Sequence, residues 1–112
     1  MIYKICSDAL WRELQITGQT LGSFDDERDG FIHFSTALQL LGTFEKYFRS
    51  EFESGSELWL LSVDPESLEP NSLRYEASSR DNYFPHLYAP LNLAQVLSAR
   101  KILTVNDLIH LA

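Results

Sequence analysis

The amino-acid sequence predicts an α+β fold for this chain of 112 residues. Segments with the twofold alternation of strands and segments with the three-and-four apolar spacing of helices are mixed without a regular order. Most connections between these segments are short, which favours α+β over a doubly wound sheet. The length allows a sizeable core and corresponds to one domain over residues 1–112.

The first predicted element is a strand over residues 2–6, rich in β-branched and aromatic side chains. Ser7 is suited to cap a helix that follows, and Gly18 is suited to end it. Cys6 lies on the apolar strand, so we expect it to be a buried hydrophobic side chain and not a nucleophile.

Residues 19–28 predict a polar connection that contains an acidic run at 25–27. Neighbouring carboxylates could bind a cation, but the regular spacing of a calcium loop is absent. We therefore interpret this segment as a solvated acidic loop.

Residues 29–34 predict a turn followed by a short strand. Alternation places Phe31 and His33 on one face of this strand, opposite to Ile32 and Phe34. The histidine therefore shares its face with a large aromatic ring.

Ser35 is suited to cap a helix over residues 36–48, whose apolar positions have the spacing of a buried face. The preceding strand would then run directly into a helix N-terminus. The free amides of that first turn would lie near His33 and could hold an anion or a polar ligand.

The C-terminal part of the chain predicts several further strands. Residues 58–63 are the most apolar run and predict a central strand that ends before Pro65. The other predicted elements are polar loops at 51–56 and 78–82, a helical turn at 65–68, a strand at 73–77, an edge or irregular strand at 84–91, a strand at 96–102 and a terminal helix at 104–111.

Charge and composition argue against several classes of partner. The 16 acidic and 9 basic residues give a formal net charge of −7, which repels phosphate backbones, so we expect no nucleic-acid partner. No apolar run reaches the roughly 18 residues of a membrane span, and we expect no membrane association. A single cysteine excludes an internal disulfide and favours a reducing cytoplasm. The oligomeric state stays open.

Common catalytic motifs are absent from the sequence. The glycines between residues 18 and 22 lack the spacing and the lysine of a phosphate-binding loop. The three histidines are scattered without metal-ligand spacing, so we predict no metal site. No nucleophile-elbow sequence supports a serine hydrolase.

Polar residues within apolar predicted strands are the candidate functional residues. Burying such a group unpaired costs about 1–3 kcal/mol, so each must be hydrogen-bonded or used. A single polar side chain of this kind more commonly has a structural role. Several of them on neighbouring strands would form one pocket. These residues are His33, Glu76, His86 and Tyr88, with Arg74 and Ser35 as neighbours.

From residue 2 to about residue 102 the chain resembles the bacterial and plant family catalogued as domain of unknown function 952. Two blocks carry most of the resemblance, at residues 30–35 and 84–91. The other matching features are Ile2, Tyr3, Trp11, Gly18, Gln39, a leucine-rich strand before Asp64, and residues 73–76. The chain departs from the family pattern at Lys4, where most members have a histidine, and at Ala89, where many have glycine.

The resemblance implies a fold like that of ADP-ribosyltransferases, a small split α+β core of mostly antiparallel strands with a cleft between two sheets. In that fold, a histidine or arginine anchors the ribose of NAD and a late glutamate holds the reacting ribose. Carried over to this chain, the resemblance implies Glu76 and His33 as catalytic residues and NAD as a candidate cofactor. The ligand-binding residues that the resemblance implies are Ser35, His86 and Tyr88. Lys4, which stands in place of the family's histidine, and Arg74, from the set of polar strand residues, are further candidate ligand-binding residues.

Three interpretations of function follow. The first is a domain that binds a nucleotide or another small ligand in the cleft between two sheets. The second is an NAD-dependent ribosyl-transferring or NAD-cleaving enzyme, in which Glu76 stabilises positive charge on the ribose. The third is a protein-interaction or structural domain whose polar strand residues are satisfied internally.

Overall fold

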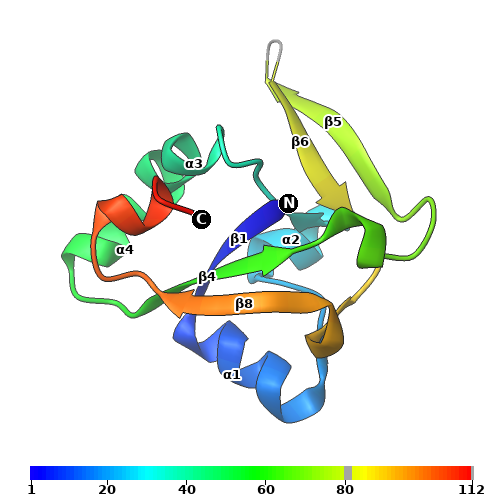
Figure 1. Ribbon diagram of the computed structural model, residues 1–112, viewed down its shortest axis with the longest axis horizontal. Helices are drawn as coiled ribbons and strands as arrows, with labels where there is room; N and C mark the ends of the chain where they lie inside the picture. Colours follow the sequence, from blue (N-terminus) through cyan, green and yellow to red (C-terminus); the bar gives the residue numbers. More distant parts are fainter. Residues whose placement is uncertain (80–81, 112) are drawn as a thin grey trace.

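A three-stranded antiparallel sheet with the order β1-β4-β8 forms the centre of the protein (Figure 1). The computed structural model describes residues 1–79 and 82–111. The most apolar predicted strand is the central one, as expected. The three strands are β1 (Ile2–Ser7), β4 (Leu58–Val63) and β8 (Val96–Lys101).

Two further antiparallel sheets, one of three strands and one of two, complete the described strands. One has the order β3-β6-β5, and the other pairs β2 with β7. Figure 1 shows the β5–β6 hairpin extending away from the rest of the molecule. Backbone hydrogen bonds between Tyr3 and Ser35, 2.8 Å in each direction, join β1 to the chain that follows β3. The strands are β2 (Gln19–Thr20), β3 (Ile32–His33), β5 (Leu73–Ser79), β6 (Asn82–Leu87) and β7 (Leu91–Asn92).

Four α-helices and three short 3₁₀ turns occur in the described residues. None of the described helices has the length and apolar composition needed to cross a membrane. The α+β class is confirmed. The helices are α1 (Asp8–Thr17), α2 (Phe24–Asp29), α3 (Leu40–Tyr47) and α4 (Arg49–Glu53), and the 3₁₀ turns are η1 (Pro65–Ser67), η2 (Leu93–Gln95) and η3 (Val105–Leu108).

The caps of α1 are those that the sequence predicts. The Ser7 side chain accepts a hydrogen bond from the backbone N–H of Leu10 at 3.1 Å. Gly18 ends the helix in the left-handed conformation, with φ of 85°.

The central sheet separates two hydrophobic clusters. Alternate residues of β4 point to opposite faces, so Leu61 packs with Leu14 of α1 and Leu60 packs with Phe44 of α3. Cys6 is buried as predicted, and burial raises the pKa of its thiol to about 12.

Several predicted elements differ from the structure. The acidic loop over residues 19–28 is wrong, because it contains β2 and α2. The helix predicted over 36–48 begins only at Leu40, and Ser35 does not cap it. The residues predicted as the first turn of this helix have a different set of hydrogen bonds. The Gln39 side chain accepts a hydrogen bond from the Thr36 amide and donates one to the carbonyl of Tyr83.

Further differences lie at the ends of elements. The polar loop predicted at 51–56 begins with residues of α4, and the terminal helix is the 3₁₀ turn η3. The extended segment predicted over 84–91 is divided between β6 and β7. The polar loop predicted at 78–82 is wrong at both ends, because β5 extends to Ser79 and β6 begins at Asn82. Its residues 80–81 lie outside the described residues.

Candidate functional site

Two histidines from different strands meet where β3 pairs with β6. His33 lies directly opposite His86 in the antiparallel register, and the ring centroids are 5.4 Å apart. The Phe31 ring packs on both, at 4.6 Å from His33 and 4.1 Å from His86. The predicted shared face of Phe31 and His33 is therefore present.

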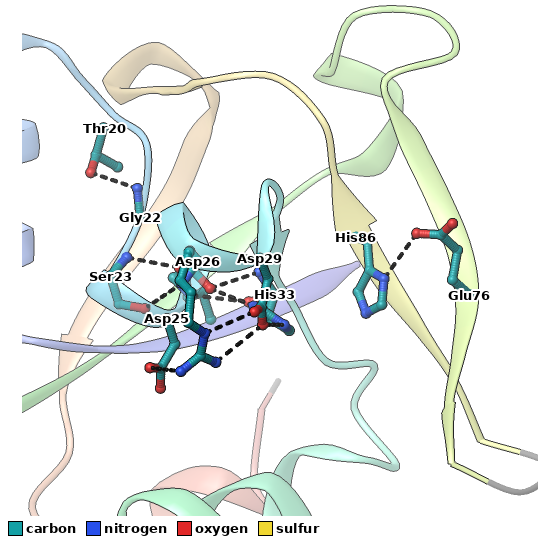
Figure 2. Close-up of polar contacts among 11 residues, drawn as sticks. Thr20, Gly22, Ser23, Asp25, Asp26, Asp29, His33, Glu76 and His86 are labelled. Atoms are coloured by element: carbon teal, nitrogen blue, oxygen red, sulfur yellow. Dashed lines mark hydrogen bonds and ion pairs between the residues drawn. The ribbon is translucent and has the colours of Figure 1, made fainter.

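His33 is held by carboxylates from α2 (Figure 2). Its Nδ1–H donates to Oδ1 of Asp26 at 2.6 Å, and its backbone N–H donates to the same oxygen at 3.1 Å. Its Nε2 lies 3.2 Å from Oδ2 of Asp29. Both ring nitrogens thus face carboxylate oxygens, which can only accept hydrogen bonds.

Asp26 is the centre of a buried network. Its side chain is 2% exposed and its Oδ2 lies 2.8 Å from Nζ of Lys4, which is itself 6% exposed. The same Oδ2 accepts the Ser23 amide at 2.8 Å, and Lys4 also donates to the carbonyl of His33 at 3.0 Å. Burial alone would raise the pKa of Asp26, but the His33 hydrogen bond and the Lys4 charge outweigh it and lower the pKa below its usual range.

The local sequence of α2 places this carboxylate. Ser23 and Asp26 form a capping box, in which each side chain accepts the other residue's amide. Gly22 has φ of 95°, and a side chain there would meet Asp26 Oδ2 at 2.2 Å, so the position requires glycine. Gly30 ends the helix in the left-handed conformation just before Phe31.

His86 has a different set of partners, which come from the β5–β6 sheet and the residue after it. Its Nδ1–H donates to Oε1 of Glu76 at 3.0 Å, and the Tyr88 hydroxyl donates to the same oxygen at 2.5 Å. The hydrogen bonds from Tyr88 and then His86 lower the pKa of Glu76, and the bond to Glu76 raises the pKa of Tyr88. Glu76 is therefore an ionised carboxylate, with 38% of its side chain exposed.

The second nitrogen of His86 has no such partner. His86 is 4% exposed, and Nε2 is buried without a hydrogen-bond partner in residues 1–79 and 82–111. Because Nδ1 carries the hydrogen donated to Glu76, Nε2 of the neutral ring is an acceptor. Among the buried side-chain nitrogen and oxygen atoms of the described residues, His86 Nε2 alone lacks a hydrogen-bond partner.

A groove adjoins the aromatic side of this cluster. It has a volume of about 280 Å³ and lies between α2 and the segment from β6 to β7. Phe31, Tyr88 and Glu27 are among the residues that line it. The exposed Arg74 guanidinium lies over the Tyr88 ring, 4.7 Å from its centroid. The groove is thus apolar and aromatic with charged groups around it.

Of the seven predicted site residues, five form this cluster: His33, Arg74, Glu76, His86 and Tyr88. Lys4 lies beneath it, buried in its ion pair with Asp26. Ser35 lies apart, where its hydroxyl is 2.7 Å from that of Thr43 and its backbone pairs with Tyr3.

The sequence analysis missed three residues of the cluster, Asp26, Asp29 and Phe31 as the packing partner of both histidines. The pattern of Ser23 followed three residues later by Asp26 is a capping-box signal that could have identified α2. No group of three or more histidine, cysteine or acidic side chains in the described part of the chain could hold a metal ion.

Comparison with known proteins places the chain among proteins of unknown function. The family model described as "Protein of unknown function (DUF952)" matches residues 5–99. The X-ray crystal structure of protein CC0527 from Caulobacter crescentus has a TM-score of 0.80 at 40% identity, over 89% of this chain and 83% of that one. The solution NMR structure of CC0527 gives a TM-score of 0.71 at 40% identity, over 88% and 81% of the two chains. No curated protein matches the chain.

Proposed function

We propose, from the premise that this chain belongs to the DUF952 family of proteins of unknown function, that it binds a small hydroxyl-bearing molecule at the His33–His86 cluster. The ligand would lie against Phe31 and Tyr88 and reach His86 through a hydroxyl or an N–H group. A nucleoside or nucleotide has this combination of a planar ring and hydroxyl groups.

The observation that carries this proposal is the buried Nε2 of His86. A buried acceptor without a donor costs about 1–3 kcal/mol, and the fixed Nδ1–Glu76 bond prevents the ring from turning Nε2 to a protein donor without losing that bond. A donor supplied by a ligand removes this cost. Phe31, which is stacked on the ring, would have to shift to admit it.

The surroundings of the groove favour a particular ligand chemistry. Phe31 and Tyr88 offer ring surface for stacking on a base. Carboxylates such as Glu76 and Asp29 accept hydrogen bonds from ribose hydroxyls. Arg74 is the exposed cation of the cluster and could contact one phosphate. This balance favours a nucleoside or a nucleotide with few phosphates.

An NAD-cleaving or ribosyl-transferring enzyme with an ADP-ribosyltransferase-like fold is the second candidate. The state of Glu76 favours it, since this carboxylate is ionised, partly exposed and oriented by two hydrogen bonds. Such a group stabilises positive charge on C1′ of the ribose while the bond to nicotinamide breaks. In hydrolysis, water then adds to C1′, and nicotinamide and a proton are released.

Thermal unfolding with added compounds tests the binding proposal. Adenosine, AMP, NAD and ADP-ribose are added separately, and a bound ligand raises the melting temperature of the folded protein. The His86→Phe variant should lose the increase, while the control His110→Gln, at an exposed histidine, should keep it. No increase with any of these compounds, or an increase that survives in His86→Phe, contradicts the proposal.

The enzymatic candidate has a separate test. Purified protein is incubated with NAD, and nicotinamide release is compared among wild type, Glu76→Gln and the exposed control Glu66→Gln. The candidate requires turnover in the wild type and the control that Glu76→Gln abolishes. Binding of NAD without turnover supports the first proposal alone.

A further inference from the structure

We propose that two copies of this chain associate through the outer edge of β5, which pairs with its own copy antiparallel about a twofold axis at Tyr75. This inference is independent of the proposed ligand. It depends on three features of β5: the direction of its backbone groups, its self-complementary charges and its place at the edge of the sheet.

The first feature is that the backbone of Tyr75 points away from the sheet. Tyr75 lies opposite Pro85 in the β5–β6 register. Pro85 has no N–H, and its carbonyl accepts the Phe34 amide at 2.9 Å on the opposite side of β6. In this antiparallel ladder, Tyr75 and Pro85 therefore form a non-hydrogen-bonded pair. The N–H and C=O of Tyr75 are therefore directed outward, and alternation directs those of Leu73 and Ala77 the same way.

The second feature is charge complementarity between two copies of the strand. Antiparallel pairing centred on Tyr75 places Arg74 of one copy directly opposite Glu76 of the other, and this happens twice. Both contacts are non-hydrogen-bonded pairs, in which facing side chains are closest. Pairing centred on Arg74 or on Glu76 would place like charges opposite each other. The charges thus select the register centred on Tyr75.

The third feature is the exposure of this edge. β5 is the outer strand of its sheet, and no strand of residues 1–79 and 82–111 pairs with its outer edge. Figure 1 shows it on the outer side of a hairpin that extends from the body, where a second copy can approach. Tyr75 is 51% exposed, and the described part of β5 has neither the proline nor the lysine that commonly protects an edge.

Association in this register would also change the candidate site. The partner's guanidinium would lie beside Glu76, the carboxylate that holds His86 and Tyr88. Pairing would extend the three-stranded sheet into a continuous six-stranded one across the twofold axis. The contact is small, so we expect a weak dimer that forms with increasing concentration.

Analytical ultracentrifugation over a range of protein concentrations tests the proposal. Wild type should form dimers, and Arg74→Glu or Glu76→Arg should each weaken the dimer by roughly tenfold or more in Kd. The double variant Arg74→Glu with Glu76→Arg restores opposite charges in the same register and should restore the dimer. Lys46→Glu on α3, which changes the net charge by the same amount as Arg74→Glu, should leave the dimer unchanged.

Tyr75→Pro removes the outward N–H without removing a hydrogen bond to β6, and it should also abolish the dimer. Circular dichroism of each variant checks that it is folded. A wild type that stays monomeric at all concentrations overturns the proposal. A dimer that survives in Tyr75→Pro overturns it as well. So does a double variant that dimerises no better than the single variants.

Discussion

The two histidines of the cluster lie side by side but differ in how completely their nitrogens are bonded. Both nitrogens of His33 contact carboxylates, and one of these, Asp26, is buried and paired with Lys4. His86 has one nitrogen on the partly exposed Glu76 and one buried nitrogen without a partner among the described residues. The same side chain on adjacent strands therefore has a satisfied and an unsatisfied environment.

This difference separates a supporting residue from a candidate binding residue. The network around Asp26 joins β1, α2 and β3, so its contacts contribute to the stability of the fold. The contacts of His86 orient the ring but leave an acceptor for an external donor. His33 would then act by holding Phe31 and the adjacent strand in place. The predictions below test this division, beginning with the largest expected effect.

The Asp26→Asn variant should be strongly destabilised. It leaves the buried Lys4 ammonium without its counter-charge, and breaking a buried ion pair in this way costs about 3–5 kcal/mol. Urea unfolding followed by circular dichroism measures the change in free energy. Asp25→Asn, one residue away and exposed, is the control and should unfold at the wild-type midpoint. Equal midpoints for the two variants would show that the Asp26 network does not support the fold.

Replacing each histidine by phenylalanine compares the two sides directly. His33→Phe leaves Oδ1 of Asp26 without its ring donor and should cost about 1–3 kcal/mol. His86→Phe removes a buried unpaired nitrogen and keeps a ring against Phe31, so its free energy of unfolding should stay near that of the wild type. The same urea experiment measures both. If His86→Phe lowered the free energy of unfolding more than His33→Phe does, His86 would be the residue that supports the fold and the division between the two histidines would be wrong.

Acid should destabilise the protein through Asp26. Its pKa is lower in the folded protein than the value near 4 expected in the unfolded chain, so the unfolded state binds the proton first as the pH falls. The stabilisation is therefore complete above about pH 4 and is lost as the pH falls towards the folded-state pKa, by at most about 1.4 kcal/mol per pH unit for one proton. Urea midpoints at decreasing pH measure this slope, and Asp26→Asn should reduce it. An unchanged slope in that variant would assign the acid sensitivity to other carboxylates.

The elements with strong apolar periodicity could be predicted from the sequence. The alternation of β1 and β4 and the caps of α1 are local patterns, and the structure has these elements within a residue or two. The six-residue helix α2 could not be recognised from periodicity, because Phe24, its apolar residue, is exposed. Its one signal is the capping box of Ser23 and Asp26, which depends on two residues alone.

The candidate site depended on information that is not local. Alternation places Phe31 and His33 on one face, and the structure agrees. The pairing of His33 with His86 is a register between strands more than fifty residues apart, which no local pattern determines. The burial of Asp26 likewise depends on Lys4 from β1, whose alternating strand pattern carries no sign of a buried ion pair.

The smallest expected effect on stability is that of Glu76→Gln. The carboxylate is partly exposed, and an amide oxygen can still accept hydrogen bonds from His86 and Tyr88, so the urea midpoint should match that of the wild type. Losing the negative charge should nevertheless lower the pKa of Tyr88, because its hydrogen bond to an ionised partner is what raises that pKa. Ultraviolet titration of Tyr88, resolved by subtracting the curve of Tyr88→Phe, measures the shift. An unchanged tyrosine titration would mean that the Tyr88–Glu76 bond does not persist in solution, and the oriented carboxylate that favours ribosyl chemistry would lose its support.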